Sequence, residues 1–219
     1  MSLKNRWDSF WSNALESSTE WETVSPNLNL INYISKNNPK NVLEIGCGAH
    51  VINANWVAEY GISTTAIDIS DVAIKYAIET NSNPLLNIRV HDMLENSISD
   101  KYDFVFDYGC FHSLNFQDDR NLFVKKISEC LSDGGTWMSI VGSTEGIHPT
   151  PNFGPPRRSV MDLAISIEPC LEIVSINQTY ISMKNDLKAP AWEVISRKRI
   201  VPATIWIPKS STNLSNQSN

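Results

Sequence analysis

Apolar residues along the chain occur in short runs that alternate with stretches of helical spacing. Five runs predict buried strands, and they are NVLEI (41–45), STTAIDI (63–69), LNIRVHD (86–92), YDFVFDYG (102–109) and GGTWMSIVG (134–142). Residues 53–60, 70–81 and 121–131 lie between them and predict helices, with Ser70 as an N-cap. Strands that alternate with helices predict a parallel sheet that is covered on both faces.

Two further strands are predicted near the end of the chain. CLEIVSINQTYI (170–181) and APAWEVISRKR (189–199) are joined by a polar turn, so we expect them to pair antiparallel. This order predicts an α/β fold, a Rossmann-like, doubly wound, mostly parallel seven-stranded sheet with an antiparallel last strand. We expect three parts: a helical and aromatic lid segment (1–35), one domain (36–200) and a disordered Ser/Asn-rich tail (201–219).

A glycine-rich loop follows the first strand, in the stretch NVLEIGCGAHVINANW (41–56). Such a loop between a strand and a helix is typical of a cofactor site in a doubly wound sheet. A dinucleotide fingerprint has the spacing G-x-G-x-x-G, and Gly46 and Gly48 satisfy its first two positions. Val51 stands at the third position, where glycine lets the helix approach a strand closely beneath a pyrophosphate. The loop therefore argues against an NAD site.

Acidic residues stand at or near the carboxyl ends of four predicted strands, and they are Glu44, Asp68, Asp92 and Asp107. In an open α/β sheet, ligands bind in the crevice outside these strand ends. A ring of carboxylates suits a neutral or cationic ligand that carries ribose hydroxyls and an amine. It does not suit a diphosphate.

Composition narrows the possible partners. The 219-residue chain has a net charge of −6 and no long basic run, which argues against a nucleic-acid partner because phosphate binding needs clustered Lys and Arg. Its four cysteines form no CxxC pair, so neither a zinc site nor a redox motif is indicated, and no metal is predicted. No signal-peptide core and no apolar run of the ~18 residues of a membrane span is found, so we expect a cytoplasmic protein without a membrane partner.

The motifs VLEIGCGAH, AIDIS, HDML, DFVFDYGCFHSL and LSDGGTWMSIV resemble, in this order, those of class I S-adenosylmethionine (SAM)-dependent methyltransferases. The flanks narrow the resemblance. EWETVSPNLNLINYI (20–34), DYGCFHSL and GPPRRSVMDL with APAWEVISRKR resemble motifs of the thiopurine, thiol and halide methyltransferases and their bacterial relatives. The resemblance implies a class I methyltransferase domain, SAM as the cofactor, S-adenosylhomocysteine (SAH) as the product, and a small-molecule methyl acceptor.

The resemblance also implies roles for the matching residues. The loop 46–48 would wrap the methionine moiety with Glu44 orienting it, Asp68 would take both ribose hydroxyls, and Ile69 would pack on the adenine. Asp92 would accept from the adenine amino group. The implied cofactor-binding residues are Trp11, Trp21, Glu44, Gly46, Cys47, Gly48, Asp68, Ile69, Asp92, Met93, Asp107 and Tyr108.

For the acceptor side, we predict His112, Asp107 and Arg157 as catalytic residues. Asp107 and Tyr108 would lie beside the methyl group. His112 either takes or tunes the acceptor's proton or is a satisfied packing histidine, since an unperturbed pKa of about 6.5 makes both charge states accessible. Arg157 either steers an anionic acceptor or faces solvent.

The sequence departs from the family at His50, where the family usually has Gly, and at Tyr108, where it has Arg. The imidazole of His50 would either bind the cofactor carboxylate or crowd the site. The predicted reaction is S-methylation of a small thiol or sulfide by in-line displacement. Two alternatives stay open, namely O- or N-methylation of a small metabolite, and a SAM-binding module without activity. The sequence does not determine the oligomeric state.

Overall fold

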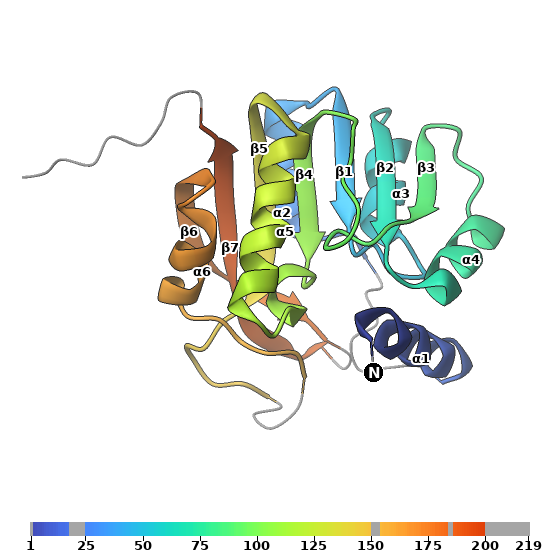
Figure 1. Ribbon diagram of the computed structural model, residues 1–219. Helices are drawn as coiled ribbons and strands as arrows, with labels where there is room; N and C mark the ends of the chain where they lie inside the picture. Colours follow the sequence, from blue (N-terminus) through green and yellow to red (C-terminus); the bar gives the residue numbers. More distant parts are fainter. Residues whose placement is uncertain (1, 18–24, 150–153, 184–185, 200–219) are drawn as a thin grey trace, which may run out of the picture.

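The computed structural model describes residues 2–17, 25–149, 154–183 and 186–199, which form a seven-stranded sheet with helices on both faces (Figure 1). The strand order is β3-β2-β1-β4-β5-β7-β6. Strands β1 to β5 pair in parallel, and β7 pairs antiparallel with both β5 and β6. The predicted fold class is confirmed, including the reversed last strand.

The strands are β1 (Asn41–Ile45), β2 (Ser63–Asp68), β3 (Leu86–Val90), β4 (Tyr102–Tyr108), β5 (Leu131–Gly142), β6 (Leu171–Ser182) and β7 (Lys188–Lys198). The helices are α1 (Leu3–Glu16), α2 (Leu28–Asn37), α3 (Ile52–Glu59), α4 (Asp71–Thr80), the 3₁₀ turn η1 (Phe111–Ser113), α5 (Gln117–Cys130) and α6 (Val160–Ile167). Figure 1 shows α5 and α6 in front of the sheet and α2 and α3 behind it. No helix in the described part of the chain is long and apolar enough to cross a membrane.

Alternating strand residues supply a separate core on each face of the sheet. Under α5 and α6 the core includes Leu43, Val105, Trp137, Phe123, Ile127 and Leu163. Under α2 and α3 it includes Val42, Phe104, Phe106, Met138, Leu30, Ile34 and Val57. Because successive side chains of a strand point to opposite faces, Glu44 and Tyr108 belong to the α2 and α3 side, whereas Asp107 belongs to the α5 and α6 side.

Some element boundaries differ from the prediction. Helix α5 begins at Gln117 rather than at residue 121, and β5 begins at Leu131 rather than after the Gly-Gly turn. The turn is part of the strand because Gly134 adopts a φ of +74° and the pairing with β4 shifts register there. Helix α6 was not predicted, although Ser159 and Asp162 form a capping box at its start.

The predicted lid segment divides into two parts. Helix α1 has no buried residue and lies below the carboxyl ends of β1 to β3, next to α4 (Figure 1). Helix α2 packs Leu30 and Ile34 into the core, and Tyr33 stacks on Phe104 with 4.2 Å between ring centroids. Helix α2 therefore packs as part of the domain core, and a lid role for α1 stays a prediction. The predicted tail (201–219) lies outside the described residues.

Candidate active site

A cavity of about 560 Å³ lies at the carboxyl ends of the strands, between the sheet and α1. This volume is within the ~300–1,000 Å³ usual for small-molecule sites. We call its first part the glycine-loop wall, formed by residues 44–48, 50–53, 67–69 and 91–94. We call its second part the Tyr108 wall, formed by Tyr108, Gly109, Cys110, His112, Ser113, Leu114, Phe123, Gly154, Pro155 and Ile181. Helix α1 covers both with Leu3, Arg6, Trp7, Phe10, Trp11 and Ala14.

The glycine loop approaches its neighbours so closely that two positions require glycine. Gly46 and Gly48 have φ values of +72° and +66°, in the left-handed region. A Cβ on Gly48 would lie 2.5 Å from the Trp11 ring, and a Cβ on Gly46 would lie 2.9 Å from the Cβ of Cys110. The N–H of Gly46 donates to the carbonyl of Ile67 at 2.8 Å, which joins the loop to β2. The loop has the shape for close approach, and α1 lies directly against it.

Asp68 connects the glycine loop to the start of α4. Its Oδ2 accepts from the Gly48 N–H at 3.0 Å, and its Oδ1 accepts from the Ser70 N–H at 2.9 Å. The side chain lines the cavity, and burial raises its pKa above the usual range. A carboxylate offers about four acceptor positions. The two backbone bonds therefore leave capacity for a pair of ribose hydroxyls.

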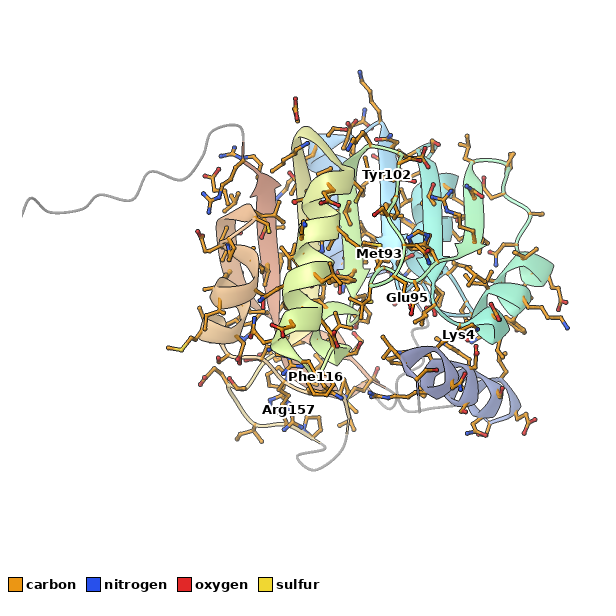
Figure 2. The ribbon with its side chains drawn as sticks, viewed as in Figure 1. Lys4, Met93, Glu95, Tyr102, Phe116 and Arg157 are labelled. Atoms are coloured by element: carbon orange, nitrogen blue, oxygen red, sulfur yellow. The ribbon has the colours of Figure 1, made fainter. Side chains whose placement is uncertain are left out.

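The loop after β3 places two more predicted residues at the cavity. Oδ1 of Asp92 accepts from the Leu94 N–H at 2.8 Å, which forms the turn that carries Met93. Asp92, Met93 and Ile69 all line the glycine-loop wall. Figure 2 shows Met93 and Glu95 on this loop, above α1. These positions are compatible with the adenine contacts that the sequence predicts, and the contacts themselves stay a prediction.

Glu44 lines the cavity and also holds α3. Its Oε1 accepts from Nδ2 of Asn53 at 3.0 Å, and its Oε2 accepts from the Ala54 N–H at 2.8 Å. The N-cap residue Val51 makes no side-chain cap hydrogen bond and has a φ of +44°, which is rare for a β-branched residue. Glu44 thus caps the helix from β1, a role that the sequence did not reveal. Burial raises its pKa to about 7.

Asp107 is not among the residues that line the cavity. It is 0% exposed, and its Oδ1 accepts from the N–H groups of Cys110 and Phe111 at 3.0 and 2.9 Å. Its Oδ2 accepts from Nε1 of Trp137 at 3.0 Å, and burial raises its pKa to about 6. A catalytic or cofactor contact of Asp107 stays a prediction, and the described contacts of this residue do not support it. Asp107 points to the α5 and α6 side and holds the turn from which the Tyr108 wall is built.

The titratable groups of the Tyr108 wall keep their neutral forms. His112 is 3% exposed, and its Nδ1 accepts from the Gly142 N–H at 2.7 Å. Burial, together with the charge of Arg158, lowers the pKa of His112 to about 3. Burial raises the pKa of Tyr108 to about 12 and that of Cys110 well above its usual range. The expectation that both charge states of His112 are accessible is therefore corrected.

The two arginines after the GPP motif have different surroundings. Arg157 is not among the described residues that line the cavity, and Figure 2 shows it with Phe116 at the lower end of α5. Nη2 of Arg158 donates to the carbonyls of His112 and Leu114 at 2.9 and 2.6 Å. A catalytic role for Arg157 stays a prediction, whereas Arg158 has a defined structural partner that the sequence did not indicate.

Helix α1 is attached to α4 by polar contacts that the sequence analysis missed. Oδ1 of Asp8 accepts from Oγ of Ser70 at 2.7 Å, and Lys4 pairs with Asp8 at 3.0 Å and with Asp71 at 2.6 Å. Figure 2 shows Lys4 on the side of α1 that faces α4. The i, i+4 spacing of Lys4 and Asp8 indicated a pair on a helix but not the second helix. Exposed pairs contribute ~0–1 kcal/mol each, so the two ion pairs of Lys4 add little to the attachment.

The remaining predicted residues divide between the cavity and the undescribed part of the chain. Trp11 and Cys47 line the cavity, and burial raises the pKa of Cys47 well above its usual range. His50 packs edge-on against Trp11 and Tyr76, with ring centroids 6.3 and 5.5 Å apart. Trp21 lies outside the described residues. Within the described ranges, no group of three or more His, Cys, Asp or Glu could hold a metal ion.

Comparisons with known proteins agree with this geometry. A family model described as a methyltransferase domain matches residues 43–138. Two uncharacterized methyltransferases of Schizosaccharomyces pombe are each 31% identical over 109 residues, which cover 48% of this chain and 74% of each relative. The range 43–138 of the family model includes the glycine loop, Asp68 at the end of β2 and Asp92 in the loop after β3.

Solved structures share the fold at low sequence identity. A structure described by the conversion of a disulfide bond into a thioacetal group during echinomycin biosynthesis is 17% identical, with a TM-score of 0.76 over 90% of this chain and 92% of that one. The N-methyltransferase NodS of Bradyrhizobium japonicum, in complex with SAH, is 16% identical, with a TM-score of 0.67 over 88% and 98% of the two chains.

Proposed function

The chain belongs to the class I SAM-dependent methyltransferases, and from this premise we propose that it transfers the methyl group of SAM to a small thiol or sulfide. The family supplies the cofactor, and SAM brings a methyl group that is activated by a sulfonium charge. The acceptor is the proposed part. One observation supports it, namely that His112 in the Tyr108 wall is buried and already accepts a hydrogen bond from Gly142 at Nδ1.

The cofactor would lie along the glycine-loop wall. Asp68 has the free acceptor capacity for the ribose, and Asp92 and Met93 lie one strand further along the sheet, where the adenine is expected. Gly46 and Gly48 would let the methionine part approach the backbone. A cofactor bound in this way would direct its methyl group towards β4, which is the neighbour of β1 on the other side. The Tyr108 wall is therefore the proposed acceptor site.

No described residue of the Tyr108 wall is suited to take a proton near neutral pH. His112 has a pKa of about 3 and uses Nδ1 to bind Gly142, while Tyr108 and Cys110 hold their protons because burial raises their pKa values. An alcohol or an ammonium acceptor must lose a proton to become nucleophilic, and a general base would have to take it. A thiol, with an ordinary pKa of about 8.5, reaches a useful thiolate fraction in solution. The wall thus favours an acceptor that is already ionised when it binds.

The chain's remaining contribution is positioning and exclusion of water. Displacement at a methyl carbon needs the nucleophile in line at roughly 3 Å, and pre-orientation supplies much of the rate. The Tyr108 wall includes the apolar side chains Leu114, Phe123 and Ile181, and Trp7, Phe10 and Trp11 of α1 line the same cavity. These aromatic side chains would desolvate a thiolate and so raise its reactivity.

The test is SAH release from SAM with three acceptors that share one ring, namely thiophenol, phenol and aniline, plus hydrosulfide and a blank without acceptor. We expect release with thiophenol and hydrosulfide to exceed release with phenol and aniline by at least tenfold at pH 7. Faster turnover of aniline or phenol would overturn the thiol proposal and favour the alternative N- or O-acceptor. A flat panel together with tight SAH binding by calorimetry would instead favour a binding module without activity.

A further inference from the structure

The imidazole of His112 lies in a slot between the ends of β4 and β5. A Cβ on Gly109 would lie 3.1 Å from Nε2, and a Cβ on Gly142 would lie 3.1 Å from Nδ1, so glycine on both sides makes room for the ring. The N–H of Gly142 donates to Nδ1 at 2.7 Å. A neutral imidazole that accepts at Nδ1 carries its proton on Nε2. The backbone of β5 therefore selects the tautomer that carries its proton on Nε2, and Nε2 lies against Gly109, which lines the cavity together with His112.

Arg158 fixes the turn that carries this ring. Its Nη2 donates to the carbonyls of His112 and Leu114, and its own backbone pairs with Gly142 at 2.8 Å through N–H. Nε1 of Trp192 donates to the Arg158 carbonyl at 3.0 Å. The same arginine thus holds both sides of the slot, and its charge opposes protonation of the imidazole.

The carbonyl groups of this turn already have donors of their own. The carbonyl of Cys110 accepts from both the N–H and the Oγ of Ser113, the latter at 2.6 Å. The carbonyl of Leu114 accepts from Arg158 and from Nη1 of Arg120 at 2.9 Å. The turn can therefore offer a bound substrate mainly hydrogen-bond donors, because these carbonyl oxygens already accept hydrogen bonds within the chain.

Among the described residues of the Tyr108 wall, His112 and Tyr108 each carry a side-chain hydrogen-bond donor. One is Nε2–H of His112. The other is the hydroxyl of Tyr108, whose oxygen accepts from the Ser182 N–H at 3.1 Å and whose proton is available to donate. Hydrogen-bond donors at this wall stabilise a ligand atom that has more lone pairs than the reaction uses. A thiolate sulfur has three and uses one in the attack, whereas a neutral amine has a single lone pair, which a donor would occupy.

We propose that His112 is the residue that recognises the ionised acceptor atom, through Nε2–H, and that Arg158 is the positioning residue that keeps this donor in place. This inference rests on the proposed thiol acceptor and identifies the residue that binds its sulfur atom. In the reaction, a new S–C bond forms between the thiolate and the methyl carbon while the bond from that carbon to the sulfonium sulfur breaks. The electron pair of the broken bond stays on the departing sulfur, and no proton reaches His112.

The first experiment compares His112→Gln with His112→Leu, using thiophenol, phenol and aniline. Glutamine keeps an acceptor for Gly142 and a donor for the substrate but cannot act as a base in water, whereas leucine keeps neither. We expect His112→Leu to lose about 10- to 100-fold in kcat/KM for thiophenol, which is what a hydrogen bond to a charged partner contributes. His112→Gln should stay within about threefold of wild type and keep the same pH profile. Equal losses in both variants, or none in the leucine variant, would overturn the role of His112.

The second experiment does not depend on turnover. Nitrogen-15 NMR of His112 in the SAH complex should show a neutral ring protonated at Nε2 from pH 5 to pH 9, and the Nε2–H signal should shift on addition of thiophenolate. Arg158→Met should weaken that shift and lower kcat/KM. The matched variant Arg197→Met, in which β7 loses the exposed ion pair with Glu172 of β6, should change neither. A ring that titrates in this range, or one protonated at Nδ1, would refute the proposal even if thiols are methylated. An unreactive thiophenol beside a reactive aniline would refute the proposed function itself.

Discussion

The glycine-loop wall and the Tyr108 wall are built from opposite kinds of polar groups. In the first, carboxylates receive hydrogen bonds from nearby backbone, as when Asp68 binds the N–H groups of Gly48 and Ser70. In the second, protonated side chains are held by distant parts of the chain, as when Arg158 binds the His112 carbonyl across 46 positions. The first wall suits a ligand with hydroxyls and an amine, and the second suits a ligand atom with negative charge. A methyltransferase that joins a cationic donor to an anionic acceptor needs both.

The difference between the strand-end acids is the sharpest test of this contrast. Asp107→Ala should lower the free energy of unfolding by on the order of 4 kcal/mol, because three buried donors lose their acceptor at ~1–3 kcal/mol each. Asp68→Ala should lose less stability but raise the dissociation constant of SAH about 10- to 100-fold, since it removes the charged acceptor at the cavity. Urea unfolding and SAH calorimetry on both variants separate the two roles.

The reverse pattern would contradict the assignment of these acids. If Asp68→Ala binds SAH like wild type, the ribose site is elsewhere. If Asp107→Ala is as stable as wild type, the acid does not hold the turn before the Tyr108 wall. If the alanine variant does not fold, Asp107→Asn replaces it in the same measurements. The asparagine keeps an acceptor for Cys110 and Phe111 and loses the hydrogen bond from Trp137.

Glu44 predicts a pH dependence of stability in the glycine-loop wall. Its pKa rises from 4.5 to about 7 on folding, so folding favours the protonated form. The contribution of Glu44 to the free energy of unfolding is fully present below pH 4.5 and is lost as the pH rises through about 7. The total loss is up to roughly 3 kcal/mol, since each unit of pKa difference corresponds to ~1.4 kcal/mol. The side chain in Glu44→Gln cannot ionise, so the free energy of unfolding of this variant should not show this decrease. Urea unfolding between pH 4 and pH 8 measures it.

In that series, wild type and Glu44→Gln share Asp68 and Asp107, whose raised pKa values act in the same direction, so their contributions cancel in the difference. The stability of the glutamine variant relative to wild type should therefore increase from pH 4.5 to pH 7 and stay level above it. Parallel curves would mean that Glu44 ionises as easily in the folded chain as in the unfolded one.

The smallest expected effect concerns the contact between α1 and the glycine loop. Gly48→Ala and Gly134→Ala both place alanine at a positive φ, at a cost of ~1–2 kcal/mol. A Cβ on Gly134 meets nothing within 4 Å, whereas a Cβ on Gly48 would lie 2.5 Å from Trp11. We expect a severalfold loss of SAH affinity in Gly48→Ala and no change in Gly134→Ala.

Adding Trp11→Ala to Gly48→Ala should recover part of that affinity if the aromatic ring, and not the backbone strain, causes the loss. SAH calorimetry on the two single variants and the double variant forms the required cycle. No recovery would mean that α1 moves away from the loop when the cofactor binds.

Much of the fold follows from the sequence because its signals are local. Each predicted strand, each predicted helix and the N-cap Ser70 can be recognised within a short stretch of the chain, and the reversed last strand follows from two neighbouring runs joined by a polar turn. Helix α6 was missed because its capping box uses Asp162 in place of the more usual Glu or Gln. The place of α2 in the core was missed because it depends on Phe104, which is far away in the sequence.

The sequence by itself determined the family, the sheet and the glycine-loop wall, since glycines and strand-end acids have a fixed place in a doubly wound fold. Only the tertiary structure decided that Glu44, Asp68 and Asp92 line the cavity while Asp107 does not, because a shift of one residue along a strand turns a side chain to the opposite face. It also decided the chemistry of His112. Burial, Gly142 and Arg158 fix the charge and the tautomer of that ring, and these three influences meet only when β4, β5 and the segment before α6 come together.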